Sequence, residues 1–157
     1  MIRTILLCCC FAVANSYAGA KEAVDNTLDR FHQYAAEANG KAYFELMSED
    51  MVYLGTDASE RWSKDDFKGY ALPYFNKGRG WLYTAKERHI IISKDGKMAW
   101  FDELLWNKKY GLVRGSGVLS LETTGEQENW KFRQYNLAFP IPNALAGEVV
   151  AKIKQHK

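Results

Sequence analysis

Four strand patterns follow one another in the second half of the chain, and this run constrains the fold more than any other feature. These patterns, rich in apolar, aromatic and β-branched residues, cover Trp81 to Ser93, Met98 to Asn107, Leu112 to Glu122 and Asn129 to Phe139. The gaps between them are short and contain glycine, as hairpin turns usually do. Because strands joined by hairpins pair with their neighbours in opposite directions, the sequence predicts a four-stranded antiparallel meander.

Two amphipathic helices are predicted before the meander. The second has Ser63 and Asp66 spaced as a capping box, and Pro73 is expected to kink it or end it early. A third helix is expected from about Asn143. The first ends near Gly40 and carries its apolar residues at helical spacing: Val24, Leu28, Phe31, Ala35 and Ala38. Helices followed by a meander predict an α+β domain in which a curled antiparallel sheet wraps around helices.

The first twenty residues have the layout of a cleavable signal peptide. A basic Arg3 precedes an apolar run from Ile5 to Ala14, and Ala18-Gly19-Ala20 is a small-x-small cleavage pattern. An apolar run of this length is too short to span a bilayer as a helix. We therefore expect cleavage after Ala20, a periplasmic or secreted location, and a single mature domain over residues 21–157 that is not held at a membrane.

Composition excludes several kinds of chemistry from that mature domain. All three cysteines, at positions 8 to 10, lie within the predicted signal peptide, so no disulfide or thiol nucleophile is expected. The three histidines are scattered without the spacing of metal ligands, so we expect no metal and no other cofactor. The net charge is +2 and no basic block follows the chain, which makes nucleic acid an improbable partner.

The turns predict which residues share a face of the sheet. Asp95-Gly96 is typical of a two-residue turn, which places His89 opposite Asp102 and Arg88 opposite Glu103. With Lys108 to Gly111 taken as a four-residue loop and Thr124-Gly125 as a two-residue turn, the His89 face also receives Gly115, Gly117, Leu119, Trp130, Phe132 and Gln134. We expect this aromatic face to be concave. The opposite face should be solvated or lie against a second subunit, and it collects Glu103, Arg114, Ser116, Lys131 and Arg133.

A series of short phrases occurs in a characteristic order along the chain. They are Gly55-Thr56-Asp57, Glu60-Arg61-Trp62, the Phe67 to Phe75 helix, Ala99-Trp100-Phe101-Asp102-Glu103, Arg114-Gly115-Ser116-Gly117-Val118-Leu119, and Trp130 through Tyr135 ending in Pro140-Ile141-Pro142-Asn143. In this order the chain resembles the nuclear transport factor two-like superfamily, and in particular its SnoaL-like branch. The helix from about Asn143 is an addition to that pattern.

The resemblance implies a cone of curled sheet wrapped around a long helix, as in the cystatin-like folds. It also implies a pocket at the open end of the cone, and often a homodimer formed through the outer face of the sheet. The superfamily includes polyketide cyclases, dehydratases and ketosteroid isomerases, together with binding or association modules that have no known chemistry. Fold alone therefore does not decide the function.

Two sets of side chains are candidates for a functional site. His89 and Asp102 form a potential acid–base pair, because a carboxylate can fix the tautomer of an imidazole; a cross-strand pair that only satisfies its own hydrogen bonds has the same spacing. The second set would hold a flat apolar ligand between rings, with amides that orient it and a carboxylate nearby, although such rings are also typical of plain core. Its members are Tyr53, Asp57, Trp62, Tyr74, Trp100, Gln134 and Asn136.

Two functions follow from these expectations. The first is an exported SnoaL-like domain that binds a small apolar molecule in a cone-shaped pocket, with cofactor-free isomerase, cyclase or dehydratase chemistry left open. The second is a catalytically inert dimeric module that associates through its sheet. A cavity holding a carboxylate with a raised pKa would favour the enzyme, whereas a cavity filled by Trp100, Trp130 and Phe132 would favour the inert module.

Overall fold

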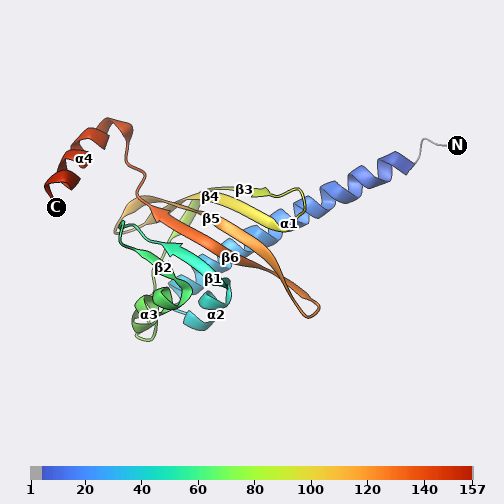
Figure 1. The fold of residues 1–157 in the computed structure, drawn as a ribbon, viewed down its shortest axis with the longest axis horizontal. Helices are drawn as coiled ribbons and strands as arrows, with labels where there is room; N and C mark the ends of the chain where they lie inside the picture. The colour runs from blue at the N-terminus through green and yellow to red at the C-terminus, as the bar shows by residue number, and fades with distance from the viewer. Residues whose placement is uncertain (1–4, 157) are drawn as a thin grey trace.

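Helices precede a long run of strands in the structure, a computed structural model that describes the backbone of residues 5–156 and the side chains of residues 17–156. The elements are α1 (Ile5–Ala36), α2 (Gly40–Glu45), β1 (Met47–Leu54), β2 (Arg61–Ser63), α3 (Lys64–Phe75), β3 (Thr84–Ile92), β4 (Met98–Asn107), β5 (Gly111–Thr124), β6 (Gln127–Ala138), a short 3-10 helix (Asn143–Leu145) and α4 (Ala146–Gln155). The predicted α+β class is confirmed, and the sheet curls over α1 (Figure 1).

The described strands form a six-stranded sheet in the order β2-β1-β6-β5-β4-β3. Strands β3 to β6 are the predicted antiparallel meander. Strand β1 joins the meander beside β6 in the parallel direction and carries β2 on its other edge. Helices α2 and α3 lie at the β1–β2 end of the sheet, so the sheet edge and the helices together close one side of the cone (Figure 1).

The apolar stripe predicted on the first helix is buried against the sheet. Val24, Leu28 and Ala35 are fully or almost fully buried. The Phe31 ring lies 4.6 Å from that of Tyr43 and 4.8 Å from that of Tyr135, measured between centroids. Rings from α1, α2 and β6 therefore meet in one aromatic core, which holds the long helix inside the cone.

The signals predicted for α3 are present. The Ser63 side chain accepts a hydrogen bond from the backbone N–H of Asp66, and the Asp66 side chain accepts one from the backbone of Ser63. Pro73 lies inside the helix, which ends soon after it, at Phe75. The capping box fixes where α3 begins, and this start places Phe67 and Tyr70 beside β1 and β2.

The predicted face assignment is wrong for the first hairpin and correct for the later strands except at Gln134. That hairpin pairs as expected, with His89 opposite Asp102. The next turn is one residue shorter than predicted, so Asp102 opposes Ser116 instead of Gly117. A slip of one residue exchanges the two faces of a strand. Gly111 at the end of this turn adopts a φ of +71°, a conformation that glycine tolerates and that lets the strand restart at once.

The concave face therefore carries Glu103 beside the aromatic and glycine residues predicted for it. Gly115 and Gly117 are buried there, as are Leu119, Trp130 and Phe132. His89, Asp102, Trp100 and Gln134 instead lie exposed on the outer face, where Asn136 is half-buried. Glu103 was predicted on the outer face, and His89 and Asp102 on the concave face; both predictions are wrong because of the shorter turn. Gln134 was also predicted on the concave face, and that prediction is wrong because the register of β5 and β6 shifts between Val118 and Leu119, so that Val118 opposes Gln134 while Leu119 opposes Phe132.

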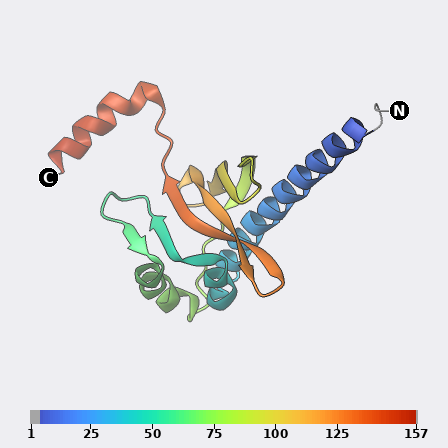
Figure 2. The same cartoon turned by 45° about the vertical axis from the view of Figure 1, so that its right-hand side comes forward.

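The two ends of the chain extend from the cone in different directions (Figure 2). Helix α4 projects away from the sheet, and all its residues are exposed or half-buried. Helix α1 continues without a break through the predicted cleavage position at Ala20. Residues 1–4 of the predicted signal peptide lie outside the described part of the chain. Within that part, no helix is both long and apolar enough to cross a membrane.

Candidate functional site

A pocket of about 190 Å³ opens where β1, β2 and α3 meet the ends of the meander. Its walls are mostly aromatic, and they are built from Tyr53, Gly55, Thr56, Glu60, Trp62, Phe67, Tyr70, Trp81, Tyr83, Tyr110 and Leu137. Tyr53 and Leu137 come from neighbouring strands of the sheet, whereas Tyr110 comes from the β4–β5 turn. The pocket therefore draws on segments from almost the whole domain, as ligand sites commonly do.

One wall of the pocket is a stack of nearly parallel rings. The centroids of Tyr53 and Phe67 are 3.8 Å apart with an interplanar angle of 20°. Trp62 lies 5.7 Å from Phe67 at 10°, and Tyr70 lies 4.9 Å from Trp62 at 21°. Side chains alternate between the two faces of β1, and Tyr53 pairs with Trp62 across β1 and β2. Phe67 and Tyr70 lie three residues apart on α3, at helical spacing. Together these arrangements set the order of the rings in the stack. Such a wall suits a flat or compact apolar ligand.

Hydroxyl groups supply the polar part of the pocket. Burial raises the pKa of Tyr83 to about 12. The pKa of Tyr70 is also raised above its ordinary value, first by burial and then by its neighbours Tyr74 and Glu60. Both phenols therefore stay protonated at neutral pH and serve as hydrogen-bond donors, not as bases.

Glu60 is the carboxylate of the pocket, and the β1–β2 loop folds around it. Its Oε2 accepts a hydrogen bond from the backbone N–H of Asp57 at 3.1 Å, and its own carbonyl accepts one from the N–H of Gly55 at 2.8 Å. A Cβ added at Gly55 would overlap the Glu60 carboxylate. Gly55 is therefore required for this close approach, which explains the glycine in that phrase of the sequence.

The structure separates the residues that the sequence analysis grouped as a ligand site. Tyr53 and Trp62 lie in the pocket. Asp57 is exposed in the loop, where its side chain accepts hydrogen bonds from the backbone and hydroxyl of Ser59, and these bonds lower its pKa. Tyr74 is exposed beside Tyr70, outside the pocket wall. Trp100, Gln134 and Asn136 are on the outer face of the sheet.

The proposed acid–base pair is also on the outer face. His89 and Asp102 oppose each other in the register, but the His89 ring forms its ion pair with Glu87, at 2.8 Å. Both residues are exposed and remote from the aromatic pocket in the register of the sheet. Their catalytic role stays a prediction that the pocket does not support. Among the described side chains, no group of His, Cys, Asp or Glu is placed to hold a metal ion.

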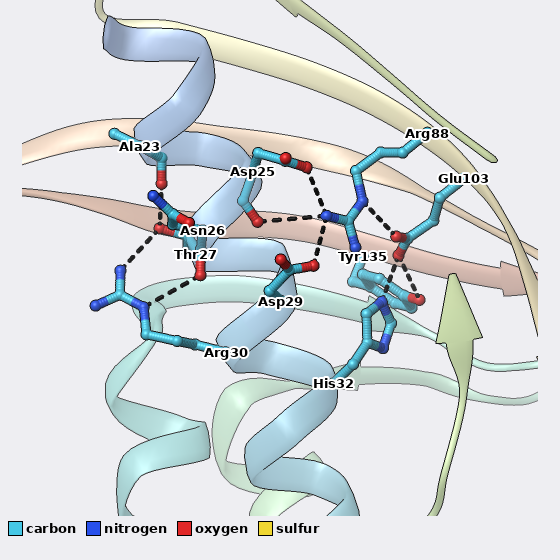
Figure 3. Close-up of polar contacts among 10 residues, drawn as sticks. All are labelled: Ala23, Asp25, Asn26, Thr27, Asp29, Arg30, His32, Arg88, Glu103 and Tyr135. Carbon is cyan, nitrogen blue, oxygen red and sulfur yellow. Dashed lines mark hydrogen bonds and ion pairs between the residues drawn. The ribbon is translucent and has the colours of Figure 1, made fainter. Parts of the chain in front are cut away.

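A buried charge network links α1 to the concave face (Figure 3). His32 Nε2 lies 2.7 Å from Glu103 Oε1, and Arg88 Nε donates to Glu103 Oε2 at 2.9 Å. Arg88 Nη1 donates to Asp25 and Asp29 at 2.6 Å and 2.8 Å. Burial alone would raise the pKa of Glu103, but its bonds to His32 and Arg88 outweigh burial and hold that pKa below its ordinary value. Glu103 is therefore a buried, ionised anchor.

This network lies behind the pocket and not in it. Tyr135 stands between the two: its hydroxyl is 3.5 Å from Glu103, and its ring lies 5.5 Å from that of Tyr53. Arg88 and Glu103 are opposite each other as predicted, but they were predicted at a surface, and their partners on α1 were not predicted. The spacing of Asp25, Asp29 and His32 along one side of the helix was the signal that could have found them.

A larger groove of about 640 Å³ between α2, α3 and the β5–β6 hairpin is a weaker candidate. It is lined by lysine and glutamate side chains that pair within the chain. Lys64 Nζ bonds to Glu49 at 2.7 Å and to the Met47 carbonyl at 2.9 Å, and Lys131 bonds to the Glu45 carbonyl. Because several of the groove's polar groups already have partners within the chain, the groove offers less to a ligand than the aromatic pocket does.

Solved structures with the same fold support this view of the architecture. An NTF2-like protein of unknown function from Pseudomonas putida KT2440 is 11% identical, with a TM-score of 0.65 over 80% of this chain and 90% of that chain. A ketosteroid isomerase-like protein from Erwinia carotovora atroseptica SCRI1043 is 16% identical, with a TM-score of 0.56 over 78% and 97%.

A protein of unknown function with a cystatin-like fold from Nostoc punctiforme PCC 73102 is 12% identical, with a TM-score of 0.58 over 80% and 95% of the two chains. At such identities the likeness extends to the fold alone. No curated protein matches the sequence. The sequence pattern of the SnoaL-like domain matches residues 24–142, from the buried stripe of α1 to the end of the sheet. The chain therefore belongs to the SnoaL-like domain family, with α4 added after the domain.

Proposed function

We propose that this SnoaL-like domain is exported and binds a small, largely apolar molecule in the aromatic pocket. The observation that carries the proposal is the ring stack of Tyr53, Phe67, Trp62 and Tyr70, which leaves apolar ring surface at the wall of a cavity of about 190 Å³. Burying a ligand against such rings is favourable, and the protonated phenols of Tyr70 and Tyr83 can donate to an oxygen on the ligand.

Binding is better supported than turnover. Glu103, the buried carboxylate, has a lowered pKa and two basic partners, so it lacks the character of a general acid. Glu60 is in the pocket, but its carboxylate also holds the loop through the Asp57 N–H. The criteria drawn from the sequence are met only in part: a cavity is present, and its lining does not include Trp100, Trp130 or Phe132.

The ring stack makes a direct prediction for binding. Trp62→Ala should weaken binding of a planar probe such as 2-naphthol by about tenfold, because it removes a central ring of the wall. Isothermal titration calorimetry on the mature domain measures this change. Trp106→Ala is the matched control, since Trp106 is 51% exposed outside the pocket. Equal affinities for wild type and Trp62→Ala would contradict the proposed site.

The outer face of the sheet supports a second proposal, a homodimer. Exposed apolar side chains oppose each other there, with Ile91 opposite Trp100 and Trp106 opposite Leu112. Exposed apolar side chains on one face of a sheet are typical of a subunit interface. This proposal is compatible with the pocket, which opens at the end of the cone and not on that face.

If the outer face forms the dimer interface, a single charge introduced on that face should prevent dimerisation. Trp100→Glu should convert a dimer into a monomer at micromolar concentration, because a buried interface cannot accept an unpaired carboxylate. Light scattering after gel filtration gives the mass directly. Val150→Glu introduces the same change at an exposed position of α4 and should leave the dimer intact. A monomeric wild type would refute the homodimer.

A further inference from the structure

The aromatic pocket contains a negative charge with no basic partner. Among the residues that line it, Glu60 is the charged one, and lysine, arginine and histidine are absent from that lining. The Glu60 carboxylate accepts one backbone hydrogen bond, from Asp57, and forms no ion pair with any side chain that the structure describes. Elsewhere in the described chain the half-buried and buried carboxylates have basic partners, as Glu103 does with Arg88 and Glu122 with Arg133.

The lining of the pocket also contains four tyrosines and two tryptophans. The faces of tryptophan and tyrosine rings carry the negative part of a quadrupole and attract cations within about 6 Å of the centroid. One of these rings already has an ammonium group beside it: Lys109 Nζ lies 4.7 Å from the centroid of Tyr110 and donates a hydrogen bond to its hydroxyl at 3.0 Å. The walls of the pocket are therefore suited to positive charge as well as to apolar surface.

We propose that the ligand of this pocket is an organic cation whose charge is covered by methyl groups or ring carbons, of the quaternary ammonium class. This inference rests on the proposed function and names the chemical class of the ligand. A methylated cation needs no hydrogen-bond acceptors, so rings and one carboxylate can replace its water. A primary ammonium has three donors to satisfy when it leaves water, and a wall made mostly of ring carbon meets that demand less well than it covers methyl groups.

A pair of probes of equal shape tests the charge preference. Choline and 3,3-dimethyl-1-butanol differ in one atom, a cationic nitrogen against a neutral carbon. Titration calorimetry on the mature domain should show choline binding about tenfold tighter than the neutral alcohol, which is the gain expected from a cation among several rings with a nearby carboxylate. Equal binding of the two probes, or preference for the alcohol, would overturn the inference.

Two charge variants add an independent check. Glu60→Gln keeps an oxygen to accept the Asp57 N–H and should lower the ratio of choline affinity to 2-naphthol affinity about tenfold. Lys109→Gln removes the ammonium beside Tyr110 and should raise choline affinity. Glu87→Gln, at an exposed carboxylate of β3, is the matched control and should change neither.

The outcomes also separate this inference from the proposed function. If 2-naphthol binds and choline does not, the cation class is wrong and the apolar pocket stands. If neither binds to the wild type, both proposals fail. If Glu60→Gln also fails to bind 2-naphthol, the substitution has disrupted the loop. The comparison of choline with its neutral isostere on the wild type then decides whether the ligand is a cation.

Discussion

Replacing Glu103 with glutamine is expected to lower the free energy of unfolding by roughly 3–5 kcal/mol, the usual cost of removing one partner from a buried ion pair. Glu103 is completely buried and bonds to both His32 and Arg88. A neutral amide cannot compensate Arg88, whose side chain is 10% exposed, and it leaves His32 without its carboxylate. Urea unfolding of the mature domain, followed by tryptophan fluorescence, measures the change.

The exposed pair of His89 and Glu87 provides the control for this variant. Glu87→Gln removes a carboxylate from a surface ion pair and should change stability by less than about 1 kcal/mol. A loss for Glu103→Gln as small as this would show that the network does not anchor α1. The wild type should also respond to acid, because the folded-state pKa of Glu103 is lowered.

The lowered pKa of Glu103 determines how the stability of the wild type changes with pH. A carboxylate with a lowered pKa in the folded state stabilises the protein above its unfolded-state pKa of about 4.3, and the contribution is lost as pH falls through the lowered value. The stability difference between wild type and Glu103→Gln should therefore be greatest at neutral pH and narrow in acid. A difference that stays constant or widens in acid would contradict this assignment of the charge.

Gly117→Ala is expected to lower the free energy of unfolding by about 3 kcal/mol, because the structure leaves no space for the added methyl group. The new Cβ would overlap the backbone carbonyl of Gln134 on the neighbouring strand and lie 2.9 Å from the Phe101 ring. A ring can shift slightly, but the carbonyl belongs to the β5–β6 ladder and moves only with the strand. Urea unfolding should show a lower midpoint with little change in slope.

Gly147→Ala is the matched control for this glycine substitution. Gly147 lies in α4 with no atom within 4 Å of an added Cβ. Alanine favours the helix by roughly 0.8–1.0 kcal/mol at such a position. Since α4 projects from the domain, the unfolding midpoint of the cone should hardly change. A Gly117→Ala protein as stable as Gly147→Ala would mean that β5 and β6 are less tightly packed than the structure has them.

Local sequence signals predicted most of the architecture. Periodicity identified the apolar stripe of α1 from Val24 to Ala35, the capping box identified the start of α3, and Asp95-Gly96 set the register of the first hairpin. Each of these depends on residues close together in the chain. The parallel pairing of β1 with β6 was not predicted, because no local pattern specifies which distant strand an edge will join.

The faces of the sheet were harder to predict than its strands. Lys108 to Gly111 is compatible with turns of three or four residues, and the choice between them decides whether Asp102 opposes Ser116 or Gly117. That single residue transferred His89 and Asp102 from the expected concave face to the outer one. Burial of Glu103 could not be predicted either, because it depends on its partners Arg88 and His32 meeting it in space.

The pocket was predictable only where its residues belong to one short segment. Tyr53 and Trp62 were identified because they flank the same loop and pair across β1 and β2. Trp81 and Tyr83 were predicted within a strand, but β3 begins only at Thr84, and Tyr110 lies in a turn. Outside the regular strands, the sequence pattern gives no information on the direction of a side chain. These residues line the pocket because the sheet closes into a cone around α1.

The most direct test of the central claim is to identify what occupies the pocket in the mature protein purified from its own compartment. Native mass spectrometry together with a crystal structure of that material should show a small, largely apolar molecule against Tyr53, Trp62 and Tyr70. Mass spectrometry of the same sample reads the first residue, which we predict to be Lys21. An empty pocket with side chains collapsed into it, and no mass beyond that of the polypeptide, would contradict the account.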